Sequence, residues 1–159
     1  MHTERTRDFL EHLLSSKKAI HALMVLGEIH LRLKGRYDPA ISLTCFRVLE
    51  KVMQQQWFPD KDILFKDLRY NLCYSSLRKA ERELKGEDSP RLKKQTIEDL
   101  ERLFRDQARD LEKEIDEIND SLYHEALKQD LLEEKFAECL EIVELQKTGL
   151  ELLRPQMDE

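Results

Sequence analysis

Histidines and cysteines are the residues of this sequence best suited to binding a metal or transferring a proton. They are His2, His12, His21, His30, His124, Cys45, Cys73 and Cys139. At about 100° per residue, His12 and His21 point to opposite sides of a helix. The Glu-x-x-His spacing of di-iron bundles and the Cys-x-x-Cys spacing of zinc sites are both missing. We therefore expect no metal, no cofactor and no disulfide, and we interpret the cysteines as buried apolar side chains in a reducing cytoplasm.

Motifs of nucleotide-binding and hydrolytic sites are absent as well. No G-x-G-x-x-G, G-x-x-x-x-G-K, G-x-S-x-G or H-E-x-x-H occurs, and the chain has only four Gly. Carboxylate pairs such as Glu133-Glu134 lie in an acidic stretch and indicate solvated charges. These residue types predict a protein that is not an enzyme.

One pairing of a cation with a histidine remains a candidate for catalysis. Arg7-Asp8-Phe9-Leu10-Glu11-His12 has the R-x-x-x-x-H spacing with a polar residue after the arginine. It resembles the motif of the HEPN family of all-α ribonucleases. The resemblance implies that Arg7 neutralises charge on the scissile phosphate while His12 transfers a proton. A ribonuclease or toxin component that uses Arg7 and His12 is therefore the alternative to a non-enzymatic function.

The composition favours an all-α fold of four or five helices. The 159 residues are 40% hydrophobic and 38% charged, with four Gly and four Pro, whereas a β-sandwich needs turn residues about every 8–12 positions. No apolar run approaches the ~18 residues of a membrane span, and the first residues lack the apolar core of a signal peptide. We expect a cytoplasmic protein with no membrane partner.

The charge is divided unevenly between the two halves of the chain. The net charge is −6, and residues 91–159 hold 20 acidic against 11 basic side chains, whereas residues 1–90 hold 13 against 16. A negative field repels phosphate groups, so we expect no nucleic-acid partner.

Residues 1–86 are expected to form the first, helical-hairpin part of the chain. Apolar positions Ile20, Leu23 and Leu31 recur at helical spacing, and Gly35 can end that helix. Asp38-Pro39 then supplies an N-cap and a proline at the first helical position of a second helix. Its expected buried residues are Ile41, Cys45, Val48, Leu49 and Val52. A third helix follows and ends at Gly86.

Part of this region resembles a helical repeat. Leu26-Gly27, followed by Gly35-Arg36-Tyr37-Asp38-Pro39-Ala40-Ile41, resembles a tetratricopeptide repeat over residues 22–50. The resemblance implies a groove that binds peptides or helices, without catalysis. An ordinary antiparallel helical hairpin uses the same residues, and both interpretations remain open.

Residues 90–159 are expected to form a long, acidic, coiled-coil-like helix or a helical hairpin that packs with residues 1–86 as one domain. Ser89 and Pro90 open the pattern. A first apolar ladder consists of Ile97, Leu100, Phe104, Ala108, Leu111, Ile115, Ile118 and Leu122, and a second of Leu132, Phe136, Cys139, Val143, Gln146, Leu150 and Leu153. Two arrangements remain open. The segment is either one helix of about 96 Å that pairs with another chain, or a hairpin that breaks at Asn119-Asp120-Ser121, and the change of register between the ladders favours a break.

The surplus of periodic apolar positions predicts a protein-interaction function. We expect an adaptor, regulator or assembly subunit that binds a protein partner, or a second copy as a homodimer, through its helical stripes. The candidate partner-binding residues are Leu100, Phe104, Leu111, Ile115, Ile118, Leu122, Phe136 and Val143.

Overall fold

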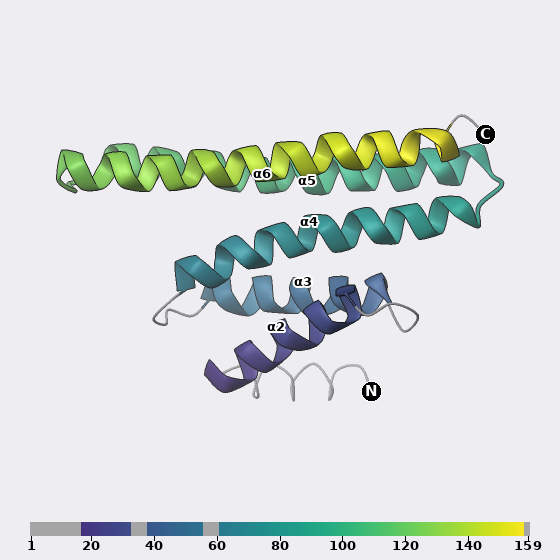
Figure 1. Cartoon of the computed structure of the whole chain (residues 1–159), viewed down its shortest axis with the longest axis horizontal. Coiled ribbons are helices and arrows are strands. Elements are labelled where there is room, and N and C mark those ends of the chain that lie inside the picture. Colours follow the sequence, from purple (N-terminus) through teal and green to yellow (C-terminus); the bar gives the residue numbers. More distant parts are fainter. Residues whose placement is uncertain (1–16, 33–37, 56–60, 158–159) are drawn as a thin grey trace. The chain divides into compact units, whose positions relative to one another are not determined.

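The computed structural model describes residues 17–32, 38–55 and 61–157, and these residues form five α-helices without a strand. The helices are α2 (Lys17–Arg32), α3 (Pro39–Gln55), α4 (Lys61–Lys85), α5 (Pro90–Asp120) and α6 (Glu125–Met157), as Figure 1 shows. The predicted all-α fold is confirmed for this part of the chain. The expected ribonuclease pair Arg7 and His12 and the helix end at Gly35 lie outside the described residues.

The chain divides into two units, Met1–Ser75 and Ser76–Glu159, and the division falls inside α4. The sequence-based boundary at residues 86–90 corresponds to the turn between α4 and α5. None of the described helices has the combined length and apolarity that a membrane span requires.

The first unit has an apolar core built by α2, α3 and the first part of α4. Its buried residues are Ile20, Met24, Leu31, Leu43, Phe46, Leu49, Val52, Met53, Leu64, Leu68 and Leu72. Of the residues expected inside α3, Cys45, Leu49 and Val52 are buried, whereas Ile41 is 40% exposed. That expectation was wrong because Ile41 lies about 140° around the helix from Phe46, which points into the core.

A close approach of α2 to α3 explains the glycine in Leu26-Gly27. A Cβ at Gly27 would lie 2.6 Å from Cε1 of Phe46, so only glycine leaves room for this ring. The Ser42 hydroxyl donates a hydrogen bond of 2.8 Å to the Gly27 carbonyl across the same contact. The Asp38 carboxylate accepts a bond of 3.0 Å from the Ala40 backbone N–H, as an N-cap residue should.

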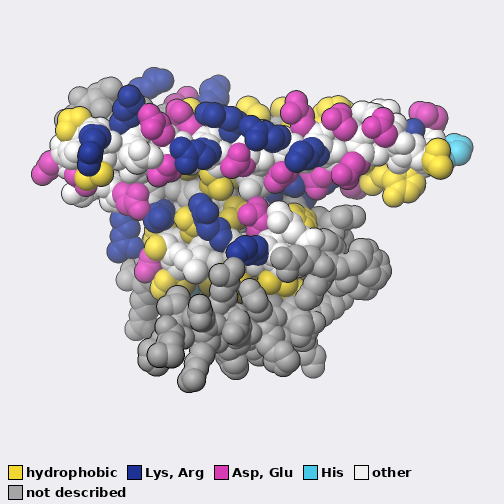
Figure 2. Space-filling view, turned by 180° about the vertical axis from the view of Figure 1, so that it is seen from behind, with side chains coloured by type: hydrophobic (Ala, Val, Ile, Leu, Met, Phe, Trp, Pro, Cys, Tyr) yellow, Lys and Arg dark blue, Asp and Glu magenta, His cyan; other side chains and the backbone are white. Residues whose placement is uncertain are grey.

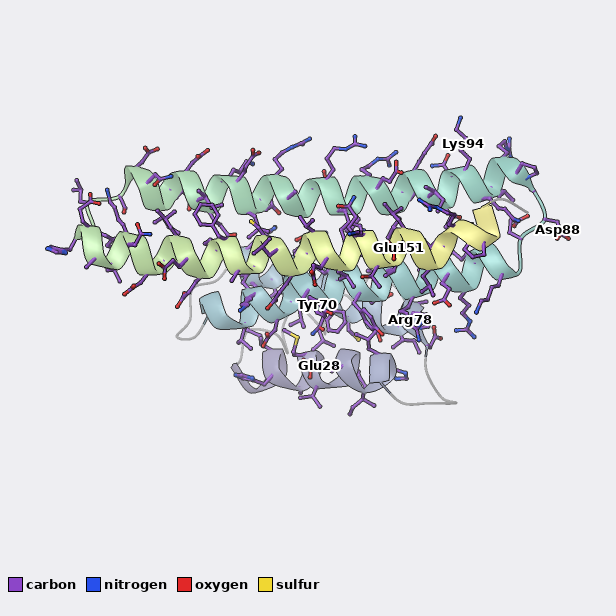
Figure 3. All side chains as sticks on the ribbon, turned by 45° about the horizontal axis from the view of Figure 1, so that its top comes forward. Glu28, Tyr70, Arg78, Asp88, Lys94 and Glu151 are labelled. Carbon is purple, nitrogen blue, oxygen red and sulfur yellow. The ribbon has the colours of Figure 1, made fainter. Side chains whose placement is uncertain are left out.

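Polar side chains also connect α4 to α2 in this unit. The Asn71 side-chain amide donates to the Glu28 carboxylate at 3.3 Å, and Figure 3 labels Glu28 on α2. On α4, the rings of Tyr70 and Tyr74 stack with their centroids 6.2 Å apart. The first unit is therefore held by an apolar core with a small number of satisfied polar contacts.

The second unit contains the end of α4 and a hairpin of α5 and α6, which lie side by side and antiparallel in Figure 1. The hairpin alternative is thus the one that the chain adopts. The break falls where the sequence indicated, because α5 ends at Asp120 and the Ser121 hydroxyl and backbone N–H both donate to the Ile118 carbonyl. Helix α5 begins at Pro90, as expected. The Ser89 side chain makes no capping hydrogen bond, and the Ser89 backbone N–H donates to the Glu87 carboxylate at 2.9 Å.

Candidate protein-docking face on α6

The apolar stripe of α5 packs inside the hairpin unit. Its buried residues are Ile97, Leu100, Phe104, Gln107, Leu111 and Ile118. Four predicted partner-binding residues, Leu100, Phe104, Leu111 and Ile118, are therefore covered within the chain, and Ile115 is half-buried. Leu122 lies beyond the end of α5 and is fully exposed. The stripe is the inner face of a hairpin, so a partner cannot reach most of it while the hairpin is closed.

The inner face of α6 differs from the one that its sequence ladder predicted. The buried residues are Glu138, Ile142, Leu145, Gly149 and Leu153. Of the expected ladder only Leu153 is buried; Leu132, Cys139, Gln146 and Leu150 are half-buried, and Phe136 and Val143 are exposed. The correction has a steric reason, because Gly149 lets the Leu77 side chain of α4 come so close that a Cβ would collide with it. That approach turns the Ile142 side of α6 inward.

A group of charged residues lies within this inner face. The Lys135 ammonium is 3.6 Å from the Glu114 carboxylate of α5 and 3.3 Å from the Glu138 carboxylate. The Lys135 side chain is only 19% exposed and that of Glu138 only 4%. Removing charges from water is costly unless they are paired, so these three residues must hold their ion pairs for the hairpin to close.

The most apolar surface of α6 points away from the hairpin. Phe136, Leu140 and Val143 are 54%, 66% and 57% exposed, and their steps of four and three residues place them on one side of the helix. We call these three residues the outer face of α6. The helix therefore has two apolar sides, and the exposed one would gain free energy from being covered by another surface.

Charge along the hairpin is polarised between its two ends. Residues 105–138, nearer the α5–α6 turn, hold 12 acidic and 5 basic side chains, whereas residues 90–104 and 139–157 hold 6 of each. In Figure 2 the Lys and Arg side chains gather toward the α4–α5 end and Asp and Glu side chains predominate toward the turn. In Figure 3, Lys94 near the start of α5 points away from α6. The turn end of the hairpin is thus the acidic end.

The described residues offer little for catalysis. They contain no group of three or more His, Cys, Asp or Glu side chains that could hold a metal. Burial raises the pKa of the Cys73 thiol to about 12, despite the nearby Arg69 cation, so this buried thiol stays protonated and unreactive at neutral pH. A surface pocket of about 380 Å³ at the start of α5 is lined by both signs of charge, among them Asp88, Lys93 and Glu98.

The described histidines do not form a site. His21 and His30 lie on α2 and His124 lies in the turn before α6. His2 and His12 are outside the described residues, as is Arg7. The ribonuclease alternative therefore stays a prediction that concerns residues 7 and 12 alone.

Comparison with models of known protein families, with characterised proteins and with solved structures found no significant match. The resemblance of residues 22–50 to a tetratricopeptide repeat stays a prediction. The contact of Gly27 with Phe46 serves a helical repeat and an ordinary helix pair equally well.

Proposed function

We propose that this chain is a non-enzymatic protein-interaction module, serving as an adaptor, regulator or assembly subunit in the cytoplasm, and that it docks through the outer face of α6. One observation carries the proposal. The hairpin keeps Lys135 and Glu138 inside while Phe136, Leu140 and Val143 remain in water. Phe136 and Val143 were among the residues expected to bind a partner, and Leu140 joins them because it lies between them on the same side.

The distribution of side chains on α6 is unfavourable for an isolated hairpin. Moving one large apolar side chain out of water contributes about 1.5–3 kcal/mol, whereas burying charges requires compensating ion pairs. Rotating α6 to bury Phe136 and Val143 would separate Lys135 from Glu114 and move Gly149 away from Leu77. The packing around Gly149 therefore supports an arrangement in which another protein covers the outer face.

A reducing cytoplasm agrees with the state of the cysteines. Cys45 and Cys73 are buried, Cys139 is half-buried, and none of the three forms a disulfide in the part of the chain that the structure describes. Free thiols in this number are typical of a reducing compartment.

Site-specific photocrosslinking tests the docking face. A photoreactive amino acid at position 140, introduced in the cells that make the protein, should give a discrete crosslinked protein. The matched control is position 141, which is also exposed but lies about 100° around the helix. Equal crosslinking at both positions, or none at position 140, would contradict the proposal.

A further inference from the structure

We propose that the protein covering the outer face of α6 is a second copy of this chain, packed antiparallel with a two-fold axis passing beside Leu140. This inference rests on the proposed function and names its partner. Most soluble oligomers are symmetric homo-oligomers, and a two-fold contact requires one surface that is complementary to itself. The exposed residues Glu133, Phe136, Val143 and Lys147 are placed about Leu140 in a way that can meet that requirement.

The outer face is arranged symmetrically along the helix. Glu133 and Lys147 each lie seven residues from Leu140, about 10.5 Å to either side of it along the axis. Both are exposed, and both lie within about 20° of Leu140 around the helix. Leu140 therefore occupies the centre of a stripe that has an acidic residue at one end and a basic residue at the other.

A two-fold axis at Leu140 brings opposite charges together. The rotation reverses the direction of α6, so that Glu133 of each copy comes opposite Lys147 of the other. Two such ion pairs form, one on each side of the axis. A parallel dimer would instead place Glu133 against Glu133 and Lys147 against Lys147, which is repulsive.

The same rotation also matches the apolar side chains. Phe136 lies four residues before Leu140 and Val143 three residues after it, both displaced toward the same side of the stripe. Phe136 of one copy therefore comes beside Val143 of the other, twice, while the two Leu140 side chains meet at the axis. All three exposed apolar residues of the outer face are covered in this single arrangement.

The distribution of charge along the whole hairpin also favours antiparallel packing of the two copies. Residues 105–138, with 12 acidic and 5 basic side chains, would repel their counterpart if two turn ends lay together. Antiparallel packing places each acidic end beside the electrically balanced end of the other hairpin. With three large apolar side chains per copy, the interface belongs to the small class, so we expect a reversible, concentration-dependent dimer.

Charge reversal at the two ends of the stripe gives a specific test on the full-length chain. Glu133→Lys creates a lysine pair at both ends of the dimer, and Lys147→Glu creates a glutamate pair at both ends. Each variant alone should dimerise about tenfold more weakly than the wild type. An equimolar mixture of the two variants should recover the wild-type affinity, because both ion pairs reform in the mixed dimer.

Sedimentation equilibrium over a wide range of concentrations measures these affinities, and circular dichroism checks that each variant keeps its helix content. Leu140→Glu should lower the dimer affinity by on the order of a hundredfold, since two carboxylates would meet at the axis. A wild-type chain that stays monomeric, or a mixture of variants that binds no better than each alone, would overturn the inference.

The outcomes separate this inference from the proposed function. A monomeric chain that still crosslinks from position 140 to a different protein keeps the docking face and removes the second copy. If the chain neither dimerises nor crosslinks from position 140, both the second copy and the docking face are ruled out.

Discussion

The α2–α3 pair and the α5–α6 hairpin both bury apolar side chains, but the hairpin also encloses the charges of Lys135 and Glu138. Between α2 and α3, Phe46, Leu49 and the contact at Gly27 are inside. In the hairpin, Lys135 and Glu138 are inside and Leu140 is outside. The buried apolar residues of α2 and α3 therefore stabilise the fold, whereas Phe136, Leu140 and Val143 of α6 remain available for association.

The largest expected loss of stability distinguishes a residue of the folding core, Phe46, from a residue of the docking face, Leu140. Phe46→Ala removes a side chain with 0% exposure and should lower the free energy of unfolding by about 3–5 kcal/mol. Leu140→Ala, at a position that is 66% exposed, should change it by less than about 0.5 kcal/mol in the monomer. Urea denaturation at low protein concentration measures both values. Similar losses for the two variants would remove the distinction between a folding core and a docking face.

Gly149→Ala tests whether the contact with Leu77 sets the orientation of α6. The added methyl group collides with the Leu77 side chain, so we expect a loss of about 1–3 kcal/mol in the free energy of unfolding, although alanine is the better helix former. Gly86→Ala is the matched control, because nothing lies within 4 Å of a Cβ at that position. Thermal unfolding compares the two variants. A stabilised Gly149→Ala protein would show that α6 does not depend on this close approach.

Lys135→Met tests how much the enclosed ion pairs of α6 contribute to the stability of the hairpin. It leaves Glu138, whose side chain is 4% exposed, without this cation, and should cost about 1–2 kcal/mol of stability. Lys79→Met removes an ion pair whose two side chains are 42% and 48% exposed, and should cost no more than about 0.5 kcal/mol.

The double variant Lys135→Met with Glu138→Met should recover most of the loss, because it removes the most buried carboxylate together with its cation and leaves only Glu114, whose side chain is 30% exposed. A double variant less stable than Lys135→Met would indicate that the ion pairs stabilise the hairpin beyond offsetting their own burial. Chemical denaturation of the three proteins gives the comparison.

The smallest expected effect is a pH dependence of the first unit. Burial raises the pKa of Cys73 from 9.0 to about 12, so the folded state favours the protonated thiol. This contribution to stability is complete below pH 9 and is lost as the pH rises from about 9 toward 12, by at most about 1.4 kcal/mol per pH unit. Cys73→Ala should therefore lose less stability than the wild type between pH 9 and pH 10. Equal slopes for the two proteins would contradict the shift.

Regular apolar spacing predicted much of this fold from the sequence. The single stripe of α5 placed Ile97, Leu100, Phe104, Leu111 and Ile118 on its buried face, and the break between α5 and α6 follows the polar Asn119-Asp120-Ser121 cluster. The candidate docking face was predicted only in part, through Phe136 and Val143. Leu140 was missed because the strict four–three ladder passed through Cys139 in its place.

The sequence alone predicted the starts of α3 and α5, because Pro39 and Pro90 fix first helical positions, and it predicted the break after α5 from weak helix formers. Only the tertiary structure decided which side of α6 is buried. Apolar residues lie on opposite sides of that helix, and periodicity alone assigns neither side to the inside. The close approach of Gly149 to Leu77 and the ion pairs of Lys135 decided between them, since both depend on residues of other helices.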